Sequence, residues 1–250
     1  MLHDQAKALE EKSWRILNPR GRHAVAAGLD APIEVEVDGN AGYYCAGMNK
    51  QASVTVNGST GVGVAENMMS GRVHVKGDAS SSAGATGCGG LLLIDGNAAA
   101  RCGISNRGID IVVKGSVGHM SAFMAQAGTL VVLGDAGDAL GDSLYEARIY
   151  VRGGVKSLGA DCIEKPLRDV HQDHLGALLQ AAGLAGQVDI SAFTRYWPAR
   201  LLDHPKIDHR RSAAGLVQRS TSRTPRVLPT TASHARAARR SRIPHASPDD

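Results

Sequence analysis

The sequence predicts an all-β protein, a right-handed single-stranded parallel β-helix of seven coils with 19 residues in each, closed by short terminal helices. Three observations predict this fold: a glycine that recurs at one fixed spacing, a short alternating apolar segment before each glycine, and a very small side chain at a fixed distance after it. The 30 glycines and the 4% aromatic content of this 250-residue chain also suit closely spaced turns better than a layered α/β core.

The repeating glycine occurs once per coil, always 19 residues after the previous one. Seven occurrences at a single spacing indicate an internal structural repeat. Most of these glycines follow a polar residue, which is typical of a turn that requires positive φ. We therefore interpret them as structural turn glycines, at which a valine would cause strain. They are Gly39, Gly58, Gly77, Gly96, Gly115, Gly134 and Gly153.

A short apolar segment precedes each glycine, and its side chains alternate with a period of two, which indicates a β-strand rather than a helix. Equivalent residues of successive coils should stack in ladders along parallel strands about 4.8 Å apart, and six such intervals give a spine of roughly 29 Å. The expected inward pairs are Val35 and Val37, Val54 and Val56, Val73 and Val75, Leu92 and Ile94, Ile111 and Val113, Leu130 and Val132, and Ile149 and Val151.

Small residues mark a second fixed position, seven residues after each turn glycine. We expect this position to face a crowded interior. Three residues after the glycine, small side chains also dominate until Lys156, where we expect the helix to end. The residues at the seventh position are Ala46, Ala65, Gly84, Gly103, Ala122, Gly141 and Ala160.

A C-terminal helix is predicted within residues 165–182, which carry leucine and valine at helical spacing and end near Gly183. An outward strand position changes along the stack from polar to apolar residues. An exposed apolar stripe of this length is unusual on a monomer, so either this helix or another subunit should cover it. The residues at this position are Glu36, Thr55, His74, Leu93, Val112, Val131 and Tyr150.

Four segments follow from these patterns. Residues 1–13 form an N-terminal helical cap, 14–163 the β-helix, 164–195 a C-terminal helix and cap, and 196–250 a basic tail that we expect to be disordered. The tail holds 11 Lys and Arg against 4 Asp, which leaves 17 basic and 20 acidic residues before it. Nucleic-acid binding by the folded body is therefore not expected. The tail composition fits either a shifted reading frame or a true basic tail that binds nucleic acid or an acidic partner surface.

Cysteine, histidine and glycine patterns show no catalytic, cofactor-binding or metal-binding residues. The four cysteines lack a CxxC pair, so we expect free buried thiols rather than a zinc site or disulfides. The polar N-terminus has no signal peptide or membrane span, which favours a cytoplasmic protein. GxG runs recur with the structural period, and therefore do not indicate a nucleotide loop. The cysteines are Cys45, Cys88, Cys102 and Cys162, and the histidines of the repeat, interpreted as structural or surface residues, are His23, His74 and His119.

Methionines are the other side chains that gather between the strands. They either fill gaps in the packing, which we favour, or line a pliable partner surface. Tyr43 and Tyr44 are candidates for a contact surface in the first coil. The methionines are Met48, Met68, Met69, Met120 and Met124.

The runs IEVEVDGNAGYYCAGM, VAENMMSGRVHVKGDAS, VGHMSAFMAQAGTLVVLGDAGDALGDS and YEARIYVRG resemble the GxGxG β-helix domain at the C-terminus of the glutamate synthase large subunit. The resemblance spans roughly residues 14–163 and is strongest to the stand-alone β-helix subunit of N-methylglutamate synthase, a complex of methylamine metabolism. More distantly, the sequence is similar to the β-helix subunits of formylmethanofuran dehydrogenase and of the formyltransferase/hydrolase complex.

The resemblance implies a non-catalytic scaffold subunit in an oxidoreductase or amidotransferase complex. Its partners would be a glutamine-amidotransferase-like subunit and an FMN-binding glutamate-synthase-like subunit. FMN and an iron-sulfur cluster would belong to a partner, and this chain would bind no cofactor. The alternatives are a scaffold of a formyl-transfer complex and an independent β-helix enzyme, which should show carboxylates clustered on adjacent coils. After Tyr196 the sequence departs from the family pattern.

Overall fold

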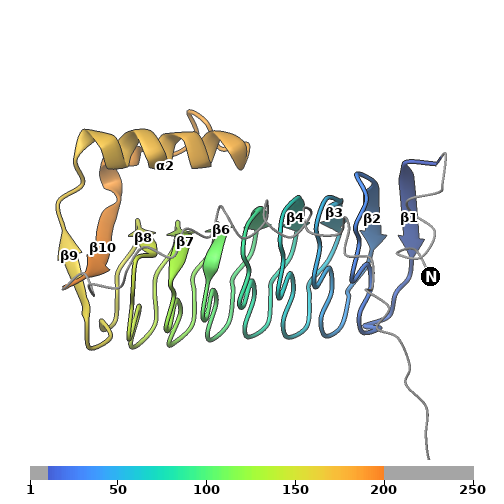
Figure 1. The fold of residues 1–250 in the computed structure, drawn as a ribbon, viewed down its shortest axis with the longest axis horizontal. Coiled ribbons are helices and arrows are strands. Elements are labelled where there is room, and N and C mark those ends of the chain that lie inside the picture. The colour runs from blue at the N-terminus through green and yellow to red at the C-terminus, as the bar shows by residue number, and fades with distance from the viewer. Residues whose placement is uncertain (1–10, 200–250) are drawn as a thin grey trace, which may run out of the picture. The chain divides into compact units, whose positions relative to one another are not determined.

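The computed structural model describes residues 11–199. In this part the strands form one sheet with the order β1-β2-β3-β4-β5-β6-β7-β8-β10-β9, and a helix, α2, lies along one side of the stacked coils (Figure 1). Strands β1 to β8 are all parallel to their neighbours. The prediction of an all-β, right-handed parallel β-helix is confirmed.

The strands are β1 (Ser13–Leu17), β2 (Glu34–Asp38), β3 (Ser53–Val56), β4 (Arg72–Val75), β5 (Leu91–Ile94), β6 (Arg107–Val113), β7 (Ala127–Val132), β8 (Arg148–Val151), β9 (Cys162–Lys165) and β10 (Thr194–Pro198). The helical elements of the described residues are α2 (Asp169–Ala181) and the short 3-10 helix η1 (Ile190–Ala192).

The 19-residue period is the register of the sheet from β2 to β8. Val35 pairs with Val54 and Val54 with Val73, and every expected inward residue is buried. β1 adds one coil in front of the glycine series, pairing Trp14 with Val35 at a spacing of 21 residues. The glycine count missed this coil because position 20, 19 residues before Gly39, holds an arginine, and because the spacing here is 21 residues. The helical cap expected for residues 1–13 falls almost wholly outside the described residues, and Ser13 already belongs to β1.

The turn glycines serve a different purpose from the one their sequence context predicts. Only Gly39, with φ of 125°, has the positive φ that we expected, and the other six do not. Space is the real constraint, because a Cβ atom on Gly115 would lie 2.6 Å from the carbonyl oxygen of Gly96 in the previous coil. The Gly115 amide donates to that same oxygen at 3.0 Å. These glycines therefore let successive coils touch through their backbones.

Left-handed backbone occurs instead at the small residue seven positions after each glycine. Ala46, Ala65 and Ala122 have φ of 52°, 55° and 57°, and Gly84, Gly103 and Gly141 are also left-handed. These residues face a crowded interior, as expected: a Cβ on Gly84 would lie 2.6 Å from Cδ1 of Ile111. Ala160 is the exception, since it is exposed where the coil ends.

Helix α2 covers the apolar part of the outward stripe, so the expectation that this helix packs there is confirmed. Its 13 residues are about 20 Å long, which matches the roughly 19 Å spanned by the four strand intervals from β4 to β8. At its C-terminal end, Nη1 of Arg72 donates to the carbonyl oxygen of Ala181 at 2.6 Å. Val170 is 65% exposed and does not join the packed face. The packed residues include Leu93, Val112, Val131 and Tyr150 of the sheet and Leu175, Leu178 and Leu179 of α2.

The C-terminal end of the sheet is closed by an antiparallel pair. β10 lies between β8 and β9 and pairs with both in antiparallel orientation. The boundary expected between residues 195 and 196 therefore lies inside a strand, because Tyr196 pairs with Ile149 and Pro198 with Cys162. The rest of the expected tail, from residue 200 onward, lies outside the described residues.

The glycine contacts can be tested with Gly115→Ala. The added methyl group must push the two coils apart, and we expect the free energy of unfolding to fall by about 2 kcal/mol. Gly154→Ala is the matched control, since its Cβ would meet only Oδ1 of Asp135, at 3.7 Å. Denaturant unfolding measures both, and an equal effect of the two substitutions would contradict the stacking explanation.

Candidate functional site

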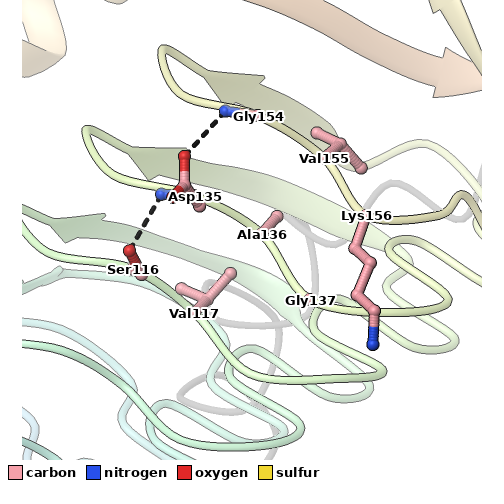
Figure 2. A pocket seen from close by; sticks show the side chains of 8 residues that line it. All are labelled: Ser116, Val117, Asp135, Ala136, Gly137, Gly154, Val155 and Lys156. Carbon is pink, nitrogen blue, oxygen red and sulfur yellow. Dashed lines mark hydrogen bonds between the residues drawn. The ribbon is translucent and has the colours of Figure 1, made fainter.

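A ladder of polar side chains runs along the turns of the β-helix. The residue after each turn glycine is Asn, Ser or Asp in six successive coils, and its side-chain oxygen accepts a hydrogen bond from the backbone N–H of the equivalent residue in the next coil. Figure 2 shows the last two steps, in which Ser116 Oγ accepts from Asp135 N at 2.9 Å and Asp135 Oδ1 accepts from Gly154 N at 2.8 Å. The ladder residues are Asn40, Ser59, Asp78, Asn97, Ser116 and Asp135.

Sequence reasoning missed this ladder, although its signal was present in the residue that follows each glycine. The ladder ends at Gly154, which has no side chain to offer a further coil. An open groove of about 550 Å³ lies over the last coils here, lined by backbone and by Asp135, Val155 and Lys156 among others (Figure 2). Lys156 Nζ is engaged with Asp138 Oδ2 at 2.7 Å beside it. The groove offers few side chains that could carry out chemistry.

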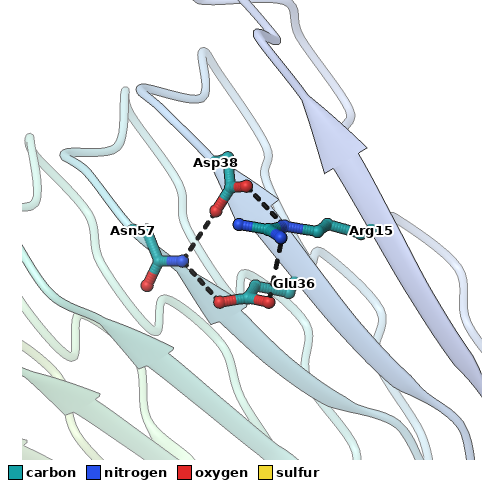
Figure 3. A network of polar contacts seen from close by, with 4 residues as sticks. All are labelled: Arg15, Glu36, Asp38 and Asn57. Atoms are coloured by element: carbon teal, nitrogen blue, oxygen red, sulfur yellow. Dashed lines mark hydrogen bonds and ion pairs between the residues drawn. The ribbon is translucent and has the colours of Figure 1, made fainter.

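A charged network lies on the outward face of the first strands, beyond the reach of α2 (Figure 3). Arg15 Nε donates to Asp38 Oδ2 at 2.6 Å and lies 3.7 Å from Glu36 Oε2. The side-chain amide of Asn57 donates through Nδ2 to both carboxylates, at 2.7 Å to Glu36 and 2.8 Å to Asp38. The hydrogen bonds from Asn57 and Arg15 lower the pKa of Asp38. This solvent-exposed network is a strand-to-strand clamp, worth little energy per ion pair.

His74 belongs to a second network on the same face. Asp95 lies between His74 Nε2, at 3.0 Å, and Lys114 Nζ, at 2.7 Å. Burial opposes ionisation of Asp95, but hydrogen bonds from Lys114 and His74 outweigh it and lower the pKa of the carboxyl group. The other two histidines of the repeat are exposed, and His23 Nδ1 accepts from the Tyr43 amide at 2.9 Å. All three therefore fit the structural or surface role that we expected.

A polar cluster lies beneath the N-terminal half of α2. His174 Nε2 is 3.1 Å from Thr129 Oγ1, and its ring lies 6.4 Å from that of Tyr150. Burial lowers the pKa of His174, and Arg148 lowers it further. Burial disfavours the charged form of Asp110 as well, and for a carboxyl group this raises the pKa; Asp110 is hydrogen-bonded to Thr129. Sequence patterns gave no sign of this cluster, because its members come from strands and a helix far apart in the chain.

Three of the four cysteines are buried free thiols, as expected, whereas Cys88 is exposed. Burial raises the pKa values of Cys45, Cys102 and Cys162 to about 12, so these thiols are not nucleophiles near neutral pH. Within residues 11–199, no three His, Cys, Asp or Glu side chains are grouped so that they could hold a metal ion. No helix of this part is long and apolar enough to cross a membrane.

Exposed apolar side chains occur on the connections between β2 and β4. Tyr43, Met48, Val62 and Met69 are 41 to 53% exposed. Tyr43 and Val62 occupy equivalent positions in adjacent coils, and Tyr43 packs against Tyr44 with ring centroids 5.7 Å apart. Of the five methionines between the strands, only Met68 is fully buried, so the gap-filling role that we favoured is wrong for the exposed ones. We refer to Tyr43, Met48, Val62 and Met69 as the apolar surface.

The described part of the chain is thus a parallel β-helix protein whose distinctive features are stacking surfaces rather than a constellation of reactive groups. No protein-family model matches the sequence. Protein GlxC of Rhizobium meliloti (strain 1021) is 61% identical over 208 residues, which cover 83% of this chain and 91% of GlxC. The chain therefore belongs to the GlxC family.

The polar ladder predicts that Asp78→Ala is destabilising. In the wild type the backbone N–H of Asn97 donates to Asp78 Oδ1 at 2.7 Å. The variant removes this acceptor and should lower the free energy of unfolding by about 1 kcal/mol. Asp78→Asn retains an acceptor oxygen and should stay within about 0.5 kcal/mol of the wild type. Chemical denaturation compares them, and identical losses in both variants would show that charge, not the ladder bond, matters.

The two histidines of α2, His171 and His174, predict a loss of stability in mild acid. Burial lowers the pKa values of His171 and His174 in the folded chain. The unfolded chain therefore takes up these protons first, so stability present above about pH 6.5 is lost as the pH falls through the folded values. The combined His171→Gln and His174→Gln variant should show a flatter dependence of Tm on pH. Exposed His119→Gln is the control, and a flattening of equal size there would refute this assignment.

Proposed function

We propose that this chain is a non-catalytic scaffold subunit of a glutamate-synthase-like complex, in particular an N-methylglutamate synthase of amine and glutamate metabolism. The observation that carries the proposal is the unbroken stack of 19-residue coils, which resembles the GxGxG β-helix of that family. The high identity to GlxC extends over most of both chains, so the two proteins are related over nearly their whole length.

In this proposal the chemistry belongs to the partners. A glutamine-amidotransferase-like subunit handles ammonia, and a glutamate-synthase-like subunit carries FMN and an iron-sulfur cluster. The β-helix binds no cofactor itself and assembles with both in the cytoplasm. Its outward charged networks use their side chains for strand-to-strand contacts, which suits a rigid support better than a reacting centre.

The apolar surface is where we expect one partner to dock. Its four large side chains are each about half exposed. Protein–protein interfaces commonly have an apolar centre, and these side chains could supply it. Two of them are methionines, whose flexible thioethers adapt to an opposing surface. The neighbouring tyrosines supply rigid contact area.

Purification of the tagged full-length protein from its native host at low salt tests the scaffold role. We expect an amidotransferase-like chain and a flavoprotein to co-elute, with flavin absorbance in the complex and none in this chain alone. Recovery of a colourless single protein would refute the proposal. Co-elution with formyltransferase-type subunits would replace it with the formyl-transfer alternative.

The docking surface is tested separately by the combined Tyr43→Ser and Val62→Ser variant. Removing two apolar side chains from the interface should weaken partner recovery at least tenfold, which corresponds to about 1.4 kcal/mol. Val170→Ser is the matched control, because Val170 is 65% exposed on the far side of α2. Circular dichroism verifies folding of both, and unchanged recovery in the double variant would place the partner elsewhere.

A further inference from the structure

We propose that the basic cluster at the N-terminal end of α2, formed by Arg148, Arg168, Arg195 and His171, is a binding site for an oxyanion, the phosphate or carboxylate group of a small molecule. The inference goes beyond the scaffold role and does not depend on it.

Arg195 is the central residue of this cluster. It lies in β10 opposite Tyr150 of β8, on the outward face that α2 covers, and is only 7% exposed. Its Nε and the Tyr150 hydroxyl are buried; the hydroxyl interacts with the Arg195 guanidinium, and neither atom has a further hydrogen-bond partner of good geometry. Among the described residues, no carboxylate forms an ion pair with Arg195. A buried guanidinium without a counter-charge is costly, so this arrangement favours the binding of an anion.

A second guanidinium is held beside the first by Trp197. The central guanidinium carbons of Arg195 and Arg148 lie 5.1 and 5.8 Å from the centroid of the indole ring. The ring face offsets part of the repulsion between the two cations, but it satisfies none of their N–H donors. Asp110 is the carboxylate that interacts with Arg148, and it is shared with His174. Its burial disfavours the charged form, so it neutralises the cluster poorly.

The first turn of α2 adds to the positive potential. Arg168 is the residue at the start of the helix, and its backbone N–H donates to His171 Nδ1 at 3.2 Å. The N-terminal end of a helix carries a partial positive charge, which attracts anions. After desolvation, the charges of Arg195, Arg168 and Arg148 are the main causes that lower the pKa of His171. Asp169 is the acidic residue of this turn, and its side chain is exposed.

The donor set defines the chemistry of the ligand. Guanidinium groups present paired N–H donors that match two oxygens of a phosphate or carboxylate group. Chloride, a single spherical ion, cannot make this paired contact. The Tyr150 hydroxyl and Arg195 Nε are the two donors that such a group would satisfy. Trp197 is half-buried and gives the site an apolar wall. These features favour a small, doubly charged oxyanion.

Thermal unfolding of the full-length protein in inorganic phosphate, in succinate and in chloride at equal ionic strength tests the site. A ligand present at ten times its Kd should raise Tm by about 4 °C, and chloride should not. The larger shift of the two identifies phosphate or carboxylate as the preferred group. Equal Tm values in all three salts would overturn the proposal.

Variants connect the shift to the cluster. Arg168 is exposed, so Arg168→Gln should fold normally and weaken the binding of the better probe about fivefold, as expected for one solvent-exposed charge contact. Arg195→Lys keeps the buried charge but loses the paired donors, and should weaken binding more than tenfold. Arg22→Gln is the control, since Arg22 is exposed in the first coil. Equal affinity in the control and both cluster variants would overturn the assignment even if the salts differ.

Discussion

Backbone contact between successive coils at the turn glycines is the constraint on which the other features of this β-helix depend. A carbonyl oxygen of one coil lies so close to the glycine of the next that a Cβ atom has no space, and the glycine amide donates to that same oxygen. The coils are therefore locked at one spacing on the turn side. That spacing sets the register of the valine and isoleucine ladders and brings each Asn, Ser or Asp within reach of the next coil's amide.

The outward face of the sheet is divided by the length of α2. A 13-residue helix reaches along the strands from β8 to β4, where Arg72 contacts its C-terminal carbonyl, and cannot reach further. The strands beneath it carry leucine, valine and tyrosine, whereas the strands beyond it carry ion pairs and amide bonds exposed to water. Covered and uncovered portions of one sheet thus differ in chemistry because one has a protein neighbour and the other has solvent.

Charge is also distributed unevenly between these portions. The carboxylates of Asp38 and Asp95 each have basic or amide partners nearby, and the pKa of each is lowered accordingly. At the N-terminal end of α2 the balance is reversed, since Arg148, Arg168 and Arg195 outnumber the carboxylates of Asp110 and Asp169. The apolar surface lies on the connections between β2 and β4 and is formed by exposed apolar side chains.

Sequence patterns alone were enough to predict the repeat, the strands, the register from β2 to β8 and the helix that covers the stripe, because each of these is a local pattern repeated at a fixed interval. They also predicted that small residues such as Ala65 and Ala122 face the interior, although the left-handed backbone was assigned to the wrong glycines. Positive φ and a lack of space both select glycine, and sequence cannot separate the two causes. The extra coil of β1, the insertion of β10 between β8 and β9, and the arginine cluster around Arg195 became visible only in the folded chain. These features join residues without a shared period, so only their positions in three dimensions bring them together.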